Sequence, residues 1–353
     1  MAARNYFLGA NSPEGFYGYF QKAYGDGWTV WLIKGGPGCG KSTLMKQVAQ
    51  NVDGEWEYIH CSSDPKSLDA IICEQRRVMI ADATAPHSME ALRPGCVERL
   101  LDLGDGFCVR KLQKTAAAID ALYRENAALH RQAVHYLAAA AQVQRVRMEQ
   151  ALAVLDEEAV QRLADQHSAA WSGYQKKKGV ERQRGLGAVT PDGIVFYKET
   201  VRSQTETLHA LNDDWGAAAA VFMAKFYRNL QMKKCDMTVC CCSLFPKERI
   251  EHILLPETRV AYVTENFAHA MATPAEIVDL RDMYGAHRPG TNEALRRLLT
   301  QEKQLLETAS GYMYQARLVH DALEEYYIQA MDFSFVQEKT EQLIRKIGTE
   351  MTE

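Results

Sequence analysis

Residues 28–49 read WTVWLIKGGPGCGKSTLMKQVA. The central part, residues 35–42, matches the pattern G-x-x-x-x-G-K-[ST] of a phosphate-binding loop. The β-branched and aromatic run before it (28–33) predicts a strand, and the apolar spacing after it predicts a helix. Because strand, loop and helix follow one another in the order that the motif requires, this stretch predicts an α/β domain with a phosphate site.

The residue types of the loop explain how a phosphate would be held. Glycines let backbone N–H groups surround the phosphate oxygens, and the helix N-terminus adds a partial positive charge. We expect Lys41 to reach the β- and γ-phosphates and the Ser42 hydroxyl to bind Mg²⁺. The residues expected to bind the nucleotide are Gly35, Gly36, Pro37, Gly38, Cys39, Gly40, Lys41, Ser42 and Thr43.

A second strand pattern ends in a carboxylate. RVMIAD (77–82) places an apolar run before Asp82, which is the Walker B pattern. Such an aspartate holds the metal ion directly or through water. We therefore expect Ser42 and Asp82 to be the metal ligands, and Lys41, Asp64 and Asp82 to be the catalytic residues.

The catalytic carboxylate is the least defined of these residues. Many ATPases carry Glu directly after the Walker B aspartate, but here Ala83 follows. Asp64 comes after the next predicted strand (56–61), where small-molecule kinases of this architecture often carry their base. The alternative is a structural Asp-Pro turn, and Asp69 is a weaker candidate for the base. No guanine-reading motif occurs, so ATP is favoured over GTP.

The sequence also contains an internal repeat, with matching segments 178 to 182 residues apart. The matches are 9–15 with 187–193, 62–66 with 243–247, Arg77-Val78 with Arg259-Val260, and His87 with His269. We therefore predict an α/β fold of two tandem P-loop NTPase-like domains with mainly parallel sheets, each with a long helical appendage.

The second copy lacks the chemistry of the first. A constant offset of 178 residues places D-D-W-G-A-A-A-A (213–220) opposite the phosphate loop. Lys41 is then answered by Ala219, and Asp82, at an offset of 182, by Thr264. The second half is therefore expected to be a pseudo-NTPase that does not bind nucleotide in the same way.

Three motifs together carry a family resemblance: G-G-P-G-C-G-K-S-T (35–43), Y-I-H-C-S-S-D-P (58–65) and A-D-A-T-A-P-H (81–87). With them, the chain resembles a group of bacterial ATP-binding proteins built from two tandem P-loop NTPase-like halves. The resemblance implies ATP binding and a cytosolic location, and it names no substrate. In that group both halves usually carry a phosphate loop, so residues 213–220 depart from its pattern.

Long helices are predicted in both halves. The segment 107–171 contains neither Gly nor Pro, and its apolar residues are three, four or seven apart. A single helix of that length would approach ~100 Å, so we expect a hairpin that turns near Asp156. The predicted organisation is an NTPase domain (1–174, hairpin 107–172), a basic linker (175–184) and a degenerate domain (185–353, C-terminal helices 292–347).

The basic linker allows a sharper hypothesis. It carries Arg182 and Arg184, and an arginine from such a segment could enter the phosphate site as an arginine finger. The simpler interpretation is a solvated connection between the two halves.

Composition limits location and partners. The chain of 353 residues has a net charge of −4, so nucleic-acid binding is unlikely. No apolar stretch is long enough to span a membrane, and the N-terminus lacks a signal-peptide core. We expect a cytoplasmic protein without membrane attachment, whose nine cysteines are mostly buried thiols.

The leading functional hypothesis is a Mg-ATP-binding P-loop ATPase that uses only its first half. The cofactors expected are ATP and Mg²⁺, and the further partner is an unidentified protein or a small-molecule acceptor. Two alternatives stay open: a small-molecule or nucleotide kinase with Asp64 as base, and an ATP-gated interaction protein with little turnover.

Overall fold

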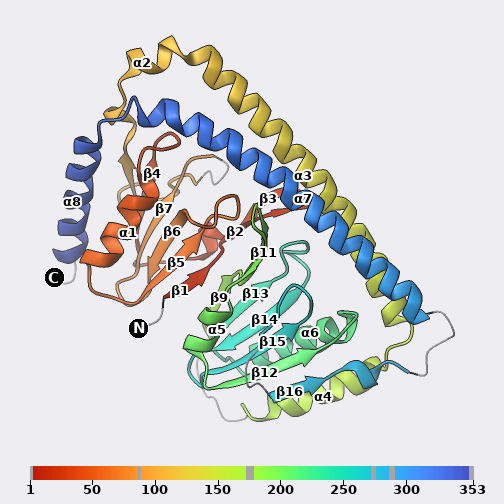
Figure 1. Ribbon diagram of the computed structural model, residues 1–353. Coiled ribbons are helices and arrows are strands. Elements are labelled where there is room, and N and C mark those ends of the chain that lie inside the picture. Colours follow the sequence, from red (N-terminus) through yellow and green to blue (C-terminus); the bar gives the residue numbers. More distant parts are fainter. Residues whose placement is uncertain (1–2, 86–88, 172–178, 272–275, 286–290, 350–353) are drawn as a thin grey trace.

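The computed structural model describes residues 3–85, 89–171, 179–271, 276–285 and 291–349 (Figure 1). It has an α/β architecture with two six-stranded sheets. The strand order of the first sheet is β1-β5-β6-β7-β4-β8. Its strands are β1 (Arg4–Tyr6), β4 (Thr29–Lys34), β5 (Trp56–His60), β6 (Leu68–Cys73), β7 (Val78–Asp82) and β8 (Glu98–Asp102).

The second sheet repeats this order as β9-β13-β14-β15-β12-β16. Its strands are β9 (Glu181–Arg184), β12 (Thr207–Asn212), β13 (Met237–Cys241), β14 (Ile250–Leu255), β15 (Val260–Glu265) and β16 (Glu276–Asp279). In each sheet one strand, β6 or β14, runs antiparallel to both neighbours, and all other pairs are parallel. The internal repeat predicted from the sequence is therefore present in the topology, and the sheets are mixed but mainly parallel.

The remaining elements also occur in corresponding places. Each half carries a β-hairpin, β2–β3 or β10–β11, where the sequence repeats at 9–15 and 187–193. The bounds are β2 (Gly9–Ser12), β3 (Gly15–Gly18), η1 (Phe20–Lys22), α1 (Lys41–Asn51), η2 (Gly104–Gly106), α2 (Val109–Lys114), α3 (Ala116–Leu152), α4 (Glu157–Ala169), β10 (Gly187–Thr190), β11 (Gly193–Phe196), α5 (Lys198–Gln204), α6 (Ala217–Met232), η3 (Arg281–Met283), α7 (Thr291–Ile328) and α8 (Phe333–Thr349).

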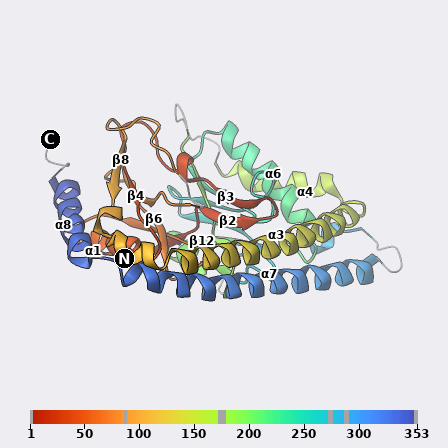
Figure 2. The ribbon, with the colours of Figure 1, turned by 90° about the horizontal axis from the view of Figure 1, so that it is seen from above.

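The two halves exchange their helices. α3 leaves the first half and α7 leaves the second, and the two run side by side along the molecule (Figures 1 and 2). At its far end α3 delivers α4 onto α6 of the second half, and α7 delivers α8 onto α1 of the first. Each half is thus completed by a helix that belongs, in sequence, to the other.

The predicted hairpin therefore differs from the structure. The turn lies where it was expected, because Asp156 caps α4 by accepting a hydrogen bond from the Ala159 N–H at 2.9 Å. α4 does not fold back on α3, however, since its apolar residues Val160 and Ala164 belong to the core around α6. Burial of this apolar stripe against the other half decides where the helix goes.

The expected linker is also different. Residues 172–178 lie outside the described residues, and residues 181–184 form the edge strand β9. Phe7, just after β1, and Gly185, just after β9, exchange backbone hydrogen bonds of 2.8 and 2.7 Å, which join the two sheets edge to edge. The junction is an ordered interface rather than a solvated connection.

The arginine-finger hypothesis is wrong for this arrangement. Arg184 is only 1% exposed and pairs with Glu57 at 2.8 Å, while Arg182 pairs with Glu74. Glu57 lies at the start of β5 and Glu74 just beyond the end of antiparallel β6. Both carboxylates are at the edge of the sheet opposite to the glycine-rich loop that follows β4, so neither arginine reaches that loop.

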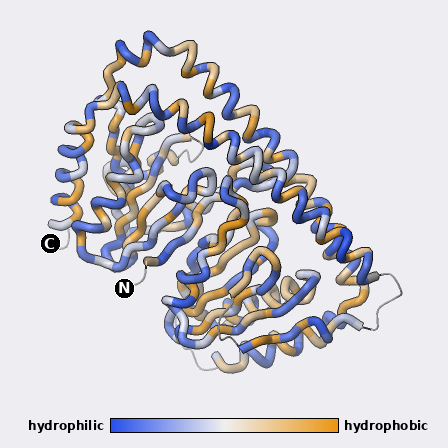
Figure 3. Tube along the Cα trace, viewed as in Figure 1, coloured by the Kyte–Doolittle hydropathy of each residue, from blue (hydrophilic) through white to orange (hydrophobic). Residues whose placement is uncertain are grey.

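Alternating side chains divide the core. Val30 and Leu32 of β4 belong to a cluster that both halves share, whereas Trp31 and Ile33 face α1 and α8. Apolar segments accordingly follow the strands in Figure 3, and the long helices alternate in character. Among the described helices, none combines the length and apolarity needed to cross a bilayer.

Candidate functional site

The glycine-rich loop (residues 35–40) connects β4 to α1 at the carboxyl end of the first sheet. Gly38 has a φ of 63° and Gly40 a φ of 89°, a left-handed conformation that glycine adopts without strain. Gly40 directly precedes the first residue of α1, so the N–H groups of the loop and of the first helical turn gather at one place. Such a place favours an anion.

Lys41 and Asp82, predicted from separate motifs, meet beside this loop. Lys41 Nζ lies 3.5 Å from Asp82 Oδ2, and both side chains are largely buried. The same ammonium group donates hydrogen bonds to the carbonyls of Gly35 at 3.0 Å and Gly36 at 2.8 Å. The other carboxylate oxygen of Asp82 accepts from the Thr84 N–H at 2.8 Å. A cation and an acidic oxygen ligand are therefore held at the same sheet edge.

Ser42 and Asp64 are connected through the backbone. Ser42 Oγ accepts a hydrogen bond from the Leu68 N–H at 3.0 Å. Leu68 follows a turn in which Asp64 Oδ2 accepts from Ser67 Oγ at 2.6 Å and Asp64 Oδ1 accepts from the Lys66 N–H at 3.3 Å. The turn that was the alternative interpretation of Asp64 is thus present, and it lies against the start of α1.

The other predicted residues have simpler surroundings. Cys39 is buried, which raises the pKa of its thiol, and its Sγ lies 3.8 Å from Lys41 Nζ. Thr43 is exposed and Pro37 partly exposed. Asp69 is buried in β6, near Cys61. His87, the repeat partner of His269, lies outside the described residues.

One part of this site was missed by sequence reasoning. α7, from the second half, covers the glycine-rich loop, and Glu324 Oε1 accepts a hydrogen bond from the Gly38 N–H at 3.0 Å. An added Cβ would lie 2.9 Å from Tyr327 at Gly36 and 2.8 Å from Ile328 at Gly38, so only glycine allows this close approach. A carboxylate from the other half therefore contacts an N–H of the kind that would bind a phosphate.

The corresponding loop of the second half is shorter. It has four residues (213–216) between β12 and α6, against six (35–40) between β4 and α1. Gly216, with a φ of 79°, precedes the helix as Gly40 does in the first half. A constant offset therefore carries the comparison two residues too far. The corrected pairs are Lys41 with Ala217 and Ser42 with Ala218, in place of Ala219 and Ala220.

An internal carboxylate occupies the start of α6. Asp213 accepts hydrogen bonds from the Trp215 N–H at 2.9 Å, the Ala219 N–H at 2.8 Å and the Tyr284 hydroxyl at 2.7 Å. It is 1% exposed. These are the donors that an anion at this helix end would use, so Asp213 takes the place of a bound phosphate.

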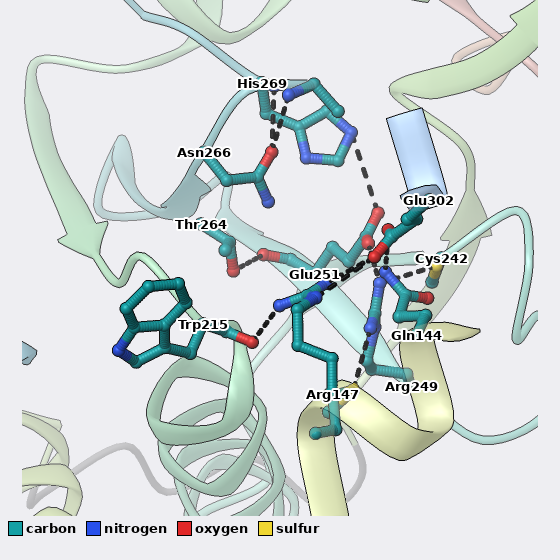
Figure 4. A network of polar contacts seen from close by, with 12 residues as sticks. Gln144, Arg147, Trp215, Cys242, Arg249, Glu251, Thr264, Asn266, His269 and Glu302 are labelled. Carbon is teal, nitrogen blue, oxygen red and sulfur yellow. Dashed lines mark hydrogen bonds and ion pairs between the residues drawn. The ribbon is translucent and has the colours of Figure 1, made fainter. Parts of the chain in front are cut away.

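A buried polar network adjoins this loop (Figure 4). Arg147 of α3 pairs with Glu302 of α7 at 2.9 Å and donates to the carbonyl of Trp215. Gln144 Nε2 donates to the other oxygen of Glu302 at 2.8 Å. The network joins both long helices to the degenerate loop, so each loop is in contact with the helix supplied by the other half.

A comparison of the chain with protein-family models, with curated proteins and with solved structures finds no match. The functional assignment therefore depends on the residues and geometry described above.

Proposed function

We propose that this protein binds Mg-ATP at the glycine-rich loop of its first half and hydrolyses it to ADP and phosphate. The observation that carries the proposal is the placement of Lys41 3.5 Å from Asp82 beside a loop with the phosphate-binding pattern. Two independent motifs, 41 residues apart, converge at one sheet edge. In this proposal the second half supports the first without binding nucleotide in the same way.

Each residue has a defined role in the proposal. The ammonium group of Lys41 exchanges the carbonyls of Gly35 and Gly36 for phosphate oxygens and neutralises their charge. The Ser42 hydroxyl and Asp82 carboxylate are the hard oxygen ligands that suit Mg²⁺, which would withdraw charge from the phosphates. Asp64, in the turn beside α1, is the candidate that orients the attacking water.

The test is phosphate release and ATP binding by the full chain and by Lys41→Ala. Removal of the ammonium group is expected to lower turnover by roughly 100-fold or more, since it stabilises transition-state charge. Lys46→Ala is the matched control, because Lys46 lies in the same helix and donates only to the exposed carbonyl of Lys66. Equal turnover by wild type and Lys41→Ala would contradict the proposal.

A second function is favoured by one observation, the contact of Glu324 with the glycine-rich loop. A nucleotide at Gly38 would displace this carboxylate and shift α7, so ATP could act as a switch for the helix pair. ATP binding that changes the hydrodynamic shape without phosphate release would select this function. ADP formation only in the presence of an acceptor would select a kinase instead.

A further inference from the structure

The second half contains a cluster of two histidines and one carboxylate that the proposed ATP site does not use. Ligand atoms of Glu251, His252 and His269 lie within 4.8 Å of one another, and all three residues are buried. A β-bulge brings them together: Cys240 pairs with His252 while Cys241 pairs with Ile250, so Glu251 is an extra residue in β14. The bulge allows consecutive residues to contribute to one cluster.

The histidines have buried ring nitrogens without partners. His252 is 1% exposed, and neither of its nitrogens has a hydrogen-bond partner among the residues that the structure describes. Within the same described part of the chain, His269 Nδ1 also has no partner. Burial, together with the neighbouring His269, lowers the pKa of His252 to about 3, so its imidazole is neutral. A buried polar group without a partner is costly, which indicates that a ligand completes the site.

Comparison of the two halves shows that the sheet does not need these groups for packing. β6 carries the same bulge, with Asp69 as its extra residue in place of Glu251. The next residue is Ala70, fully buried, where the second half has His252. The second half has thus a histidine at a position that an alanine fills in an equivalent sheet.

The surroundings favour a cation. Glu251 and His269 line a cavity of about 60 Å³ beside the degenerate loop. Two arginines and four carboxylates line it, so with neutral histidines its wall has two excess negative charges; they are Arg147, Arg249, Asp213, Asp214, Glu251 and Glu302. A divalent ion would balance that charge.

One oxygen of Glu251 remains available to a metal. Arg249 Nη2 contacts Glu251 Oε1 at 2.6 Å, and the other oxygen, Oε2, lies 3.7 Å from His269 Nε2 (Figure 4). Arg249 therefore orients the carboxylate, as groups around a metal site commonly orient its ligands.

We propose that Glu251, His252 and His269 form a binding site for a divalent first-row transition metal ion, with its remaining coordination position toward the cavity. Two imidazole nitrogens and one carboxylate oxygen are a ligand set that suits Zn²⁺ and its neighbours in the series. Small side-chain rotations bring the three ligand atoms to bonding distances of about 2.0–2.2 Å. The site is independent of the proposed ATP site.

The test is titration of the EDTA-treated full chain with Zn²⁺ by calorimetry and with Co²⁺ by absorption spectroscopy. We expect saturable binding of one ion per chain and a Co²⁺ spectrum with d–d bands of low coordination number. His252→Ala should weaken binding by at least about 100-fold, since even changes around the ligands cost 10–100-fold. This variant is expected to fold, because Ala70 occupies the equivalent position, and its melting curve checks that.

Two controls separate the alternatives. His135→Ala changes an exposed histidine of α3 and should leave binding unaltered. His320→Ala changes a second group of potential ligands, formed with Asp321 and Glu324 on α7. Loss of binding in His320→Ala but not in His252→Ala would overturn the proposal, as would the lack of saturable binding by the wild type, which would leave water as the partner of the histidines.

Discussion

At the scale of single residues, the contact between Glu324 and the Gly38 N–H is the feature most relevant to nucleotide binding. It puts a negative charge where the phosphates of ATP would carry theirs. The two anions compete for one donor, so the carboxylate should lower the affinity for ATP. The contact also connects an element of the second half directly to the loop of the first.

Glu324→Gln tests this competition. Removal of the charge is expected to tighten ATP binding by about tenfold, the order of one charged hydrogen bond. The measurement is ATP titration of both proteins at one ionic strength. The neighbouring exposed residue gives the control, Glu325→Gln, which changes the charge of α7 equally without contact to the loop. Weaker ATP binding by Glu324→Gln would show that the carboxylate assists the nucleotide.

The buried pair of Arg184 and Glu57 is a second feature at this scale. The two side chains are 1% and 8% exposed and join β9 to the first sheet. Arg184→Met leaves Glu57 as a buried charge with a weakened set of partners, so we expect a loss of about 3–5 kcal/mol in the free energy of unfolding. Urea unfolding measures it.

The double variant Arg184→Met, Glu57→Met is the matched comparison. Two apolar side chains of similar volume should recover most of the stability, since a hydrophobic replacement of a buried pair is often neutral. A double variant no more stable than the single one would contradict this explanation.

At the scale of elements, α8 stabilises a half to which it does not belong in sequence. Val336, Leu343 and Ile347 pack into the cluster that contains Leu44 and Val48 of α1. α8 therefore covers the helix that begins at Lys41, and a change in α8 should affect the glycine-rich loop.

Leu343→Ala is the corresponding prediction. Leu343 is 2% exposed, and its truncation should cost about 2–5 kcal/mol. Hydrogen exchange should increase mainly in α1, far away in sequence, rather than in the second half. Glu341→Ala, at an exposed position of the same helix, serves as the control. Faster exchange confined to the second half would contradict the observed packing.

At the scale of the whole molecule, the exchange of helices makes the two halves interdependent. Residues 1–174 lack α8, and residues 185–353 lack α4. Each piece exposes the apolar face that the missing helix covers in the full chain. The division into two sequence halves is therefore not a division into two independent folding units.

Expression of the two pieces tests this interdependence. Each alone is expected to show no cooperative unfolding transition, whereas the two expressed together should associate through α3 and α7 and unfold cooperatively. Circular dichroism and size-exclusion chromatography provide the measurements. A cooperative transition of residues 1–174 alone would show that α8 is dispensable.

Local patterns predicted much of this molecule. The glycine-rich loop, its strand and helix, the cap at Asp156 and the internal repeat all depend on residues a few positions apart, where backbone conformation and apolar spacing act directly. The approach of Lys41 to Asp82 was also predictable, because the carboxyl ends of parallel strands meet at one edge of a sheet.

Long-range packing decided the rest. The sequence of α3 is compatible with a hairpin or a crossing, and only burial of Val160 and Ala164 against α6 selects the crossing. Glu324 reaches Gly38, 286 residues away, as a consequence of that choice. Local spacing determines which elements form, but the surfaces that those elements bury determine which half each one completes.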